Sequence, residues 1–262
     1  MNSLAFSTLG CPQWSLERIL EAAAEYGYDA VELRGLQEHM DLPAAPPFAP
    51  NRRAETRRRF EDAGVAVCCV SSSGVVAKNN LDHVRAHAEL AHDLGCPLVR
   101  VFGGNLPDDV PHVAAVQRAA ETLRAFGDAA QEARVALVLE THDAFSTGAQ
   151  VAELLAVTAH PAVFSLWDLH HPFRQNEPIE TTYQYLAPTV RHVHVKDGIN
   201  GKYTLMNEGD VPLAAMLDLL LGGGYTGPLS LEWEKRWHPE IADPEVAFPQ
   251  YARALRTCLD AR

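Results

Sequence analysis

The stretch ALVLETHDAFSTGAQVAELLAVTAHPAVFSLWD, residues 136–168, contains the pattern that decides the fold of this chain. An apolar run ends at Glu140, an amphipathic segment follows at Ala149–Val157, and a second apolar run ends at Asp168. Short apolar runs that alternate with longer helical patterns are typical of βα units in a parallel sheet. Both apolar runs also end in an acidic residue, and this second regularity indicates where functional side chains lie.

The same alternation continues along the whole chain. We predict strands at Leu4–Thr8, Ala30–Leu33, Val65–Ser71, Leu98–Phe102, Ala136–Glu140, Val163–Asp168, His192–Lys196 and Leu229–Glu232. We predict helices at Ser15–Tyr26, Ala54–Ala63, Leu81–Leu94, Val113–Ala133, Ala149–Val157, Ile179–Leu186, Leu213–Leu220 and Glu245–Leu259.

Eight βα units in 262 residues match the usual size of a closed barrel. We therefore predict an α/β fold, a (β/α)8 TIM barrel formed as a single domain by residues 1–262. A doubly wound open sheet is the alternative, but no GxGxxG follows the first strand, where a dinucleotide-binding sheet would carry it. The Pro-rich segment 40–50 is interpreted as a rim loop, because no shift in composition follows it.

Composition narrows the class of protein. The net charge of −12 disfavours nucleic-acid binding, which depends on Lys and Arg displacing counterions from phosphates. The five cysteines show no CxxC spacing, which favours a reducing cytoplasm. No apolar run approaches the length of a membrane span, and the N-terminus lacks the pattern of a signal peptide. We expect a soluble cytoplasmic protein, for which a homodimer packed through outer helices would be unsurprising.

Residues that can bind a metal close four successive late strands of the predicted barrel, namely Glu140, Asp168, His194 and Glu232. The carboxyl ends of barrel strands surround the active site, so these side chains are expected to converge on one ion. Three carboxylates and an imidazole favour one divalent metal ion, Mn²⁺ first, with Mg²⁺, Co²⁺ and Zn²⁺ also compatible. Alone, each residue would more often be a helix cap or half of an ion pair. Glu234 shares the strand parity of Glu232, which we prefer as the ligand because it comes first after the apolar run.

Other polar residues near the predicted ligands are candidates for substrate binding. His142 and Lys196 each stand two residues beyond a ligand, so a continuing strand would aim them to the same side. His171 stands three residues after Asp168, in the expected loop. Arg100 is a weaker candidate, as is Glu32, because either can belong to a polar layer inside the barrel. The alternative for the first three is rim histidines and a solvated lysine.

Three histidines in the third predicted helix resemble a zinc pair only superficially. His83 and His87 are four residues apart, but the sequence between them is not the Glu-containing HExxH. We interpret these two residues, together with His92, as part of a solvated outer helix face.

The chain resembles the xylose-isomerase-like barrel superfamily of sugar phosphate isomerases and epimerases. The likeness rests on motifs spread over nearly the whole chain. They are Ser7-Thr8-Leu9-Gly10-Cys11-Pro12, Gly27-Tyr28-Asp29-Ala30-Val31-Glu32-Leu33, Leu139-Glu140-Thr141-His142, Asp168-Leu169-His170-His171, His192-Val193-His194-Val195-Lys196-Asp197 and Gly224-Tyr225-Thr226-Gly227 followed by Ser230-Leu231-Glu232-Trp233-Glu234.

The resemblance implies that the Glu, Asp, His and Glu bind the metal, and that Glu140 and Glu232 also exchange a proton with the carbon beside a substrate carbonyl. It implies a substrate contact at His171. Endonuclease IV, in the same superfamily, requires more histidines for three zinc ions and a basic surface, which this acidic chain lacks. The segment Glu232–Glu240 departs from the epimerases and puts a plain ketose 3-epimerase in doubt.

The leading interpretation is a metal-dependent isomerase or epimerase acting on a small carbohydrate, a free or phosphorylated sugar or a keto-polyol, through an enediolate. A lyase is the alternative, because the same proton abstraction expels a leaving group one carbon further on. A barrel subunit that binds sugar without turnover is the third interpretation.

Overall fold

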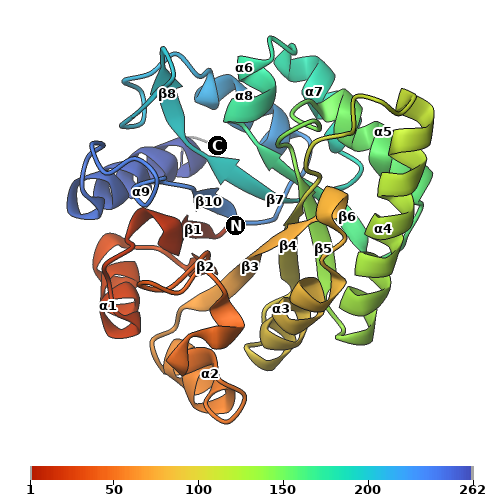
Figure 1. The fold of residues 1–262 in the computed structure, drawn as a ribbon. Coiled ribbons are helices and arrows are strands. Elements are labelled where there is room, and N and C mark those ends of the chain that lie inside the picture. The colour runs from red at the N-terminus through yellow and green to blue at the C-terminus, as the bar shows by residue number, and fades with distance from the viewer. Residues whose placement is uncertain (1, 261–262) are drawn as a thin grey trace.

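The computed structural model describes residues 2–260, and its eight-stranded parallel sheet closes on itself in the order β1-β10-β7-β6-β5-β4-β3-β2 (Figure 1). The predicted TIM barrel is confirmed, because all eight predicted strands are present. They are β1 Leu4–Ser7, β2 Ala30–Leu33, β3 Ala66–Val75, β4 Leu98–Phe102, β5 Ala136–Glu140, β6 Val163–Asp168, β7 Val190–Val195 and β10 Leu229–Leu231.

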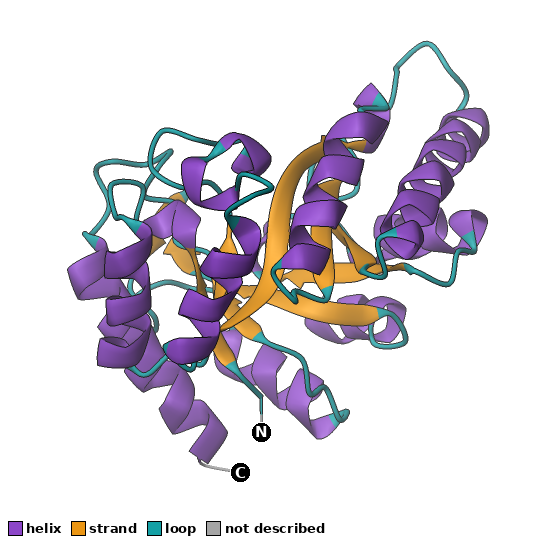
Figure 2. Cartoon of the chain, turned by 90° about the horizontal axis from the view of Figure 1, so that it is seen from below, coloured by secondary structure: helices purple, strands orange, loops and turns teal. Residues whose placement is uncertain are grey.

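Helices surround the strands on the outside (Figure 2). They are α1 Leu16–Tyr26, α2 Arg53–Asp62, α3 Leu81–Asp93, α4 His112–Glu132, α5 Gly148–Thr158, α6 His170–Arg174, α7 Ile179–Leu186, α8 Leu213–Gly222 and α9 Pro244–Asp260. In Figure 1 the chain proceeds around the ring, so that α9, in blue, comes to lie near α1, in red. Among residues 2–260, no helix is long and apolar enough to cross a membrane.

Local sequence signals explain several helix ends. The Ser15 side chain accepts a hydrogen bond from the Arg18 amide at the start of α1, and Gly27 ends that helix in the left-handed conformation at φ 78°. Thr147 and Gln150 form a reciprocal capping box at the start of α5. These capping interactions fix where α1 and α5 begin and where α1 ends, and so where the loops that join them to the strands begin and end.

Burial explains why the strands read as apolar runs. Barrel strands face side chains on the inside and helices on the outside, so both faces exclude water. Some buried polar residues interrupt the runs, and those that bear on the site gather toward the carboxyl ends, where β6 and β7 pair in a register that sets Asp168 opposite His194. His194 also lies opposite Ser230 of β10, two residues before Glu232. The register therefore places the late polar residues side by side.

Three local features differ from the predictions. A short antiparallel hairpin, β8 Asp197–Ile199 and β9 Lys202–Thr204, follows β7 and was not predicted. His171 lies in α6 and not in a loop. The Pro-rich segment contains two 3-10 turns, Leu42–Ala44 and Pro46–Phe48, of which Leu42 and Phe48 are buried.

Asp197 anchors the loop that carries this hairpin. Its buried carboxylate accepts hydrogen bonds from the backbone amides of Gly198, Asn207, Gly209 and Val211. One carboxylate therefore satisfies four donors that span 14 residues of loop.

We expect Asp197→Ala to loosen residues 197–211 while the barrel stays folded. Loss of the charged acceptor leaves buried amides without partners and should cost about 2 kcal/mol or more of local stability. Hydrogen exchange of the hairpin amides measures the effect, and Asp210→Ala, at an exposed position nearby, is the control. Unchanged protection in Asp197→Ala would contradict this role.

Candidate active site

The four predicted ligands meet at the carboxyl end of the barrel. Glu140 ends β5, Asp168 ends β6, His194 lies in β7, and Glu232 directly follows β10. One ligand atom from each lies within 4.8 Å of the others. All four side chains are buried, the most exposed being Glu232 at 5%. Residues spread over 93 positions of sequence thus form one compact group.

The buried imidazole of His194 faces three carboxylates. Its Nδ1 lies 3.3 Å from Glu232 Oε2 and 3.7 Å from both Glu140 Oε1 and Asp168 Oδ2. No described residue makes a hydrogen bond to this nitrogen. A buried nitrogen ringed by carboxylate oxygens and left without a partner is costly unless a cation occupies the space between them.

A further carboxylate, Glu32, fixes which nitrogen of His194 carries the proton. Glu32 lies 3.0 Å from His194 Nε2 and 2.7 Å from His192 Nε2, and it accepts a 2.6 Å hydrogen bond from the Ser71 hydroxyl. An ionised carboxylate only accepts, so His194 Nε2 carries a hydrogen, and Nδ1 is the nitrogen whose lone pair becomes available to a metal when the imidazole is neutral. Burial would lower the pKa of His194, but Glu232 and Glu32 raise it well above its ordinary value, so a metal ion would take the place of a proton on Nδ1. Burial would raise the pKa of Glu32, but His194 and His192 together hold it well below its ordinary value. The residues therefore fit a metal ion.

Lys196 neutralises part of this acidic group. Its fully buried ammonium lies 2.7 Å from Asp168 Oδ2, 2.5 Å from Glu232 Oε2 and 2.8 Å from Glu234 Oε1. Burial would lower the pKa of Lys196, but the three carboxylates raise it well above its ordinary value. The interpretation of a solvated lysine is therefore wrong, and a substrate contact by Lys196 stays a prediction. Glu234 contacts Lys196 and does not belong to the group of four.

His142, His171 and Arg100 lie beside Glu140, although sequence alone placed them only loosely. The two imidazole rings are 4.7 Å apart, and each offers a nitrogen that lies within 4.8 Å of a Glu140 oxygen. Arg100 Nε lies 3.3 Å from Glu140 Oε2, and its guanidinium stacks 3.8 Å from the centre of the Phe102 ring. These groups line the mouth of the barrel, which is the end formed by the carboxyl ends of the strands, with hydrogen-bonding side chains next to the Glu140 carboxylate.

The hairpin adds a residue that the sequence analysis missed. The Tyr203 hydroxyl donates a 2.8 Å hydrogen bond to Glu234 Oε1, and its ring lies 5.1 Å from that of His238. Asn200-Gly201 is a common pair in tight hairpin turns, and both residues have positive φ here, 53° and 77°. That dipeptide was the signal that could have revealed the hairpin.

The histidines of α3 are not all solvated. His92 is exposed, as expected, but His87 is fully buried, so the interpretation of a solvated face is wrong for that residue. His83, His87 and Asp41 form a second group that could hold a metal, in which His83 Nδ1 and His87 Nε2 lie 3.7 Å and 3.8 Å from Asp41 Oδ1. However, His83 Nε2 accepts the Ser73 amide hydrogen, so a neutral His83 carries its proton on Nδ1, the atom that a metal would need. The tautomer therefore argues against a metal at this cluster.

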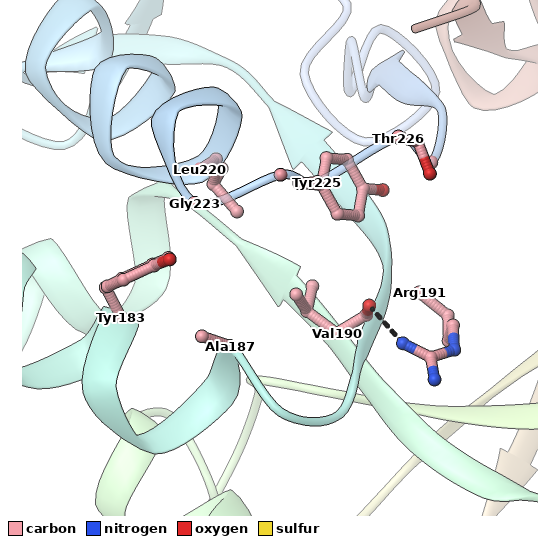
Figure 3. Close-up of a pocket in the computed structure, with 10 residues that line it drawn as sticks. Tyr183, Ala187, Val190, Arg191, Leu220, Gly223, Tyr225 and Thr226 are labelled. Carbon is pink, nitrogen blue, oxygen red and sulfur yellow. Dashed lines mark hydrogen bonds between the residues drawn. The ribbon is translucent and has the colours of Figure 1, made fainter.

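A cavity of about 280 Å³ lies at the opposite end of the barrel (Figure 3). Its lining comes from α7 and the turn after it, the start of β7, the end of α8 and the segment before β10, and none of the predicted site residues contributes to it. The lining residues are Tyr183, Ala187, Val190, Arg191, Leu220, Gly223, Gly224, Tyr225, Thr226 and Gly227.

The chain is similar to known proteins over most of its length. The family model described as "Xylose isomerase-like TIM barrel" matches residues 20–258. A fructoselysine 3-epimerase of Escherichia coli O157:H7 is 22% identical over 248 residues, which cover 86% of this chain and 88% of that protein. An inosose dehydratase of Bacillus licheniformis is 27% identical over 168 residues, which cover 55% of this chain and 53% of that protein.

Solved structures support the same fold. An L-ribulose 3-epimerase superposes with a TM-score of 0.83 at 20% identity, covering 100% of this chain and 95% of that chain. At this identity the likeness establishes the barrel architecture.

We expect Lys196→Met to destabilise metal-free protein by about 3–5 kcal/mol at pH 7, because it leaves buried carboxylates without their cation. Burial would raise the pKa of Asp168 and Glu232, but Lys196 and His171 hold that of Asp168 well below its ordinary value, and His194 and Lys196 hold that of Glu232 at about 2. The wild-type carboxylates thus stay ionised as the pH falls from 7 to 5. The carboxylates of the variant take up protons over this range, which relieves the repulsion between them. The difference in free energy of unfolding between wild type and Lys196→Met should therefore be smaller at pH 5 than at pH 7.

Urea unfolding in the presence of a chelator, at pH 7 and pH 5, measures both effects. Lys202→Met removes the same charge from an exposed position and is the control. The assignment fails if the two variants lose equal stability, or if the loss in Lys196→Met is independent of pH.

Proposed function

Because this chain belongs to the xylose isomerase-like TIM barrel family, we propose that it is an enzyme of the isomerase or epimerase type that acts on a small carbohydrate. The similar proteins named above, two epimerases and a dehydratase, support this class. The observation that carries the proposal is the convergence of Glu140, Asp168, His194 and Glu232, whose ligand atoms lie within 4.8 Å of one another in a buried group.

In the proposed enzyme these four residues hold one divalent cation. The lone pair of His194 Nδ1, oriented by Glu32, and the three surrounding carboxylates support this assignment. When bound, such a cation polarises the substrate carbonyl and stabilises the negative charge that develops on its oxygen. The oxygen-rich set favours Mn²⁺, while Mg²⁺, Co²⁺ and Zn²⁺ are also compatible.

Glu140 and Glu232 are the proposed proton carriers. Glu140 ends β5 and Glu232 directly follows β10, and because β6 and β7 separate these strands in the barrel, the two carboxylates approach the centre from different sides. One carboxylate removes the proton from the carbon beside the carbonyl, which gives an enediolate, and the other returns a proton to that carbon. Return on the opposite face inverts the carbon, which is epimerisation.

The remaining predicted site residues bind or position in this scheme. His142, His171 and Arg100 offer N–H groups near Glu140 to substrate oxygens. Lys196 holds Glu232 through a 2.5 Å contact and so fixes the orientation of one proton carrier.

A lyase is the second candidate, and one observation favours it. The imidazoles of His142 and His171 lie beside Glu140, where one of them can protonate a leaving hydroxyl after proton abstraction. The dehydratase among the similar proteins supports this alternative. The products discriminate: an epimerase conserves the mass of its substrate, whereas a dehydratase releases water.

Exchange of the proton beside the carbonyl, followed by NMR in deuterated water, tests the proposed function. Protein loaded with Mn²⁺ is expected to exchange this proton in at least one compound of a panel of ketoses and keto-inositols, and chelation should stop the exchange. Glu140→Gln and Glu232→Gln are each expected to reduce exchange by about 10²-fold or more, because each removes an acid–base group.

Circular dichroism checks that both variants fold, and Glu208→Gln, at an exposed position, is the matched control. Retained exchange in both variants would refute the mechanism with two glutamates. A complete lack of exchange in the wild-type protein across the panel would favour the non-catalytic sugar-binding interpretation.

Metal affinity provides a test that does not depend on turnover. We expect Glu32→Gln to weaken Mn²⁺ binding by about 10–100-fold, because partners that orient a ligating histidine contribute on this scale. Competition with a fluorescent chelator measures the dissociation constant. Glu38→Gln changes an exposed glutamate just beyond β2 and should leave the affinity unaltered. Equal affinities in wild type and Glu32→Gln would contradict the role of Glu32.

A further inference from the structure

Arg34, the residue directly after β2, is a buried cation without a counterion. Its side chain is 8% exposed, and Nη1 donates a 3.0 Å hydrogen bond to the Ser73 hydroxyl. No carboxylate oxygen in residues 2–260 lies within the 4.0 Å limit of an ion pair with its guanidinium. Burying a charge is costly unless it is paired, so this arrangement requires an explanation.

The backbone holds Arg34 in a fixed position at the barrel mouth. Its amide donates a 2.8 Å hydrogen bond to Thr8 Oγ1, and the Thr8 hydroxyl in turn donates a 2.6 Å bond to the carbonyl of Gly35. Gly35 has φ 83°, a conformation that other residues rarely adopt. The guanidinium therefore starts from a rigid base, as a preorganised binding group does.

Arg100 is the second incompletely partnered guanidinium. Its side chain is 1% exposed, and Nη1 has no hydrogen-bond partner among the described residues. The ion pair with Glu140 uses Nε, on another edge of the planar group. An N–H group that is buried and unsatisfied beside the reactive carboxylate is positioned for an acceptor that arrives with a ligand.

The two arginines stand on either side of β3. Arg34 follows β2 and bonds to Ser73 of β3, while Arg100 of β4 pairs in register with Ser71 of β3. Burial first, and then repulsion from Arg100, lower the pKa of Arg34 to about 9, and the more distant carboxylates Glu232, Glu140 and Glu32 offset only part of this effect. Two cations thus repel each other in a buried region, although a shared anion between them would remove that repulsion.

Arg53 shows what a structural arginine looks like in this molecule. It is similarly buried, at 7% exposure, but it pairs with Asp93 at 2.9 Å and donates to the Phe48 carbonyl at 2.9 Å. The chain therefore supplies partners to a buried guanidinium away from the mouth. At the mouth it leaves hydrogen-bonding capacity open on two of them.

We propose that Arg34 and Arg100 form an oxyanion subsite that binds the carboxylate or phosphate of an anionic sugar substrate, an inference that rests on the proposed function of the barrel mouth. Planar guanidinium groups bind carboxylate and phosphate oxygens through paired, charge-assisted hydrogen bonds. The subsite lies next to Glu140, so it anchors one end of the substrate beside a proposed proton carrier. The substrate class is accordingly a sugar acid or a sugar phosphate, and not a neutral ketose.

Calorimetric titration of Mn²⁺-loaded protein with fructose, fructose 6-phosphate and 5-ketogluconate tests the subsite. At least one anionic compound is expected to bind about ten-fold or more tightly than fructose, and the stronger of the two identifies phosphate or carboxylate as the group. Arg34→Met and Arg100→Met should each remove most of this advantage. Arg34→Lys should retain part of it, because it keeps the charge and loses the planar geometry.

Arg58→Met is the control for net charge, since it removes an exposed arginine from α2. It should preserve the preference for the anionic ligand. Equal affinity for neutral and anionic compounds in the wild type would overturn the subsite, as would a preference that survives both Arg34→Met and Arg100→Met.

Proton exchange measured on the same compounds separates the subsite from the proposed function. Selective anion binding that depends on Arg34, without exchange in any compound, would leave the subsite standing and refute the enzyme. Exchange of the fructose proton, without any preference for the anionic compounds, would support the enzyme and refute the subsite.

Discussion

A hydrogen bond inside the barrel, between Glu32 and His194, determines how the polar end of this molecule is organised. Glu32 is fully buried and 3.0 Å from His194 Nε2, so the imidazole turns Nδ1, the nitrogen that a metal would bind, toward the mouth. Three carboxylates then face that nitrogen from three other strands. A rotated or oppositely protonated His194 would place an N–H where a cation is needed. The ligand geometry thus depends on a residue that does not belong to the group of four.

Charge is distributed unevenly around the mouth. On the side of β6, β7 and β10, the single ammonium of Lys196 contacts three carboxylates, so this half of the site keeps an excess of negative charge. On the side of β2 and β4, Arg34 has no ion pair and Arg100 uses only part of its guanidinium. The acidic half suits a metal and proton transfer, while the basic half suits the recognition of an anion. The polarity of the mouth would therefore give a substrate one orientation.

The sequence was sufficient for the barrel and for the convergence of the four residues, because both follow from one regularity. A barrel strand is buried on both faces and stays apolar until its carboxyl end, so a carboxylate or imidazole at that point marks the mouth. Contacts between side chains do not follow from such a pattern. The burial of His87, the three partners of Lys196 and the unpaired state of Arg34 depend on distances between elements far apart in the chain, which periodicity does not encode.

The choice between isomerase and lyase depends on how a substrate would lie across this divided mouth. An anionic group held at Arg34 and Arg100 would sit beside Glu140, so the rest of the molecule would extend toward Lys196, Glu232 and the hairpin that carries Tyr203. Abstraction by Glu140 then concerns a carbon near the anchored end, and return of the proton by Glu232 concerns the opposite face. A hydroxyl that points to His142 and His171 would leave as water, whereas one that points to the hairpin would stay. The same carboxylates support either outcome, and the position of the anchor relative to the leaving hydroxyl selects between them.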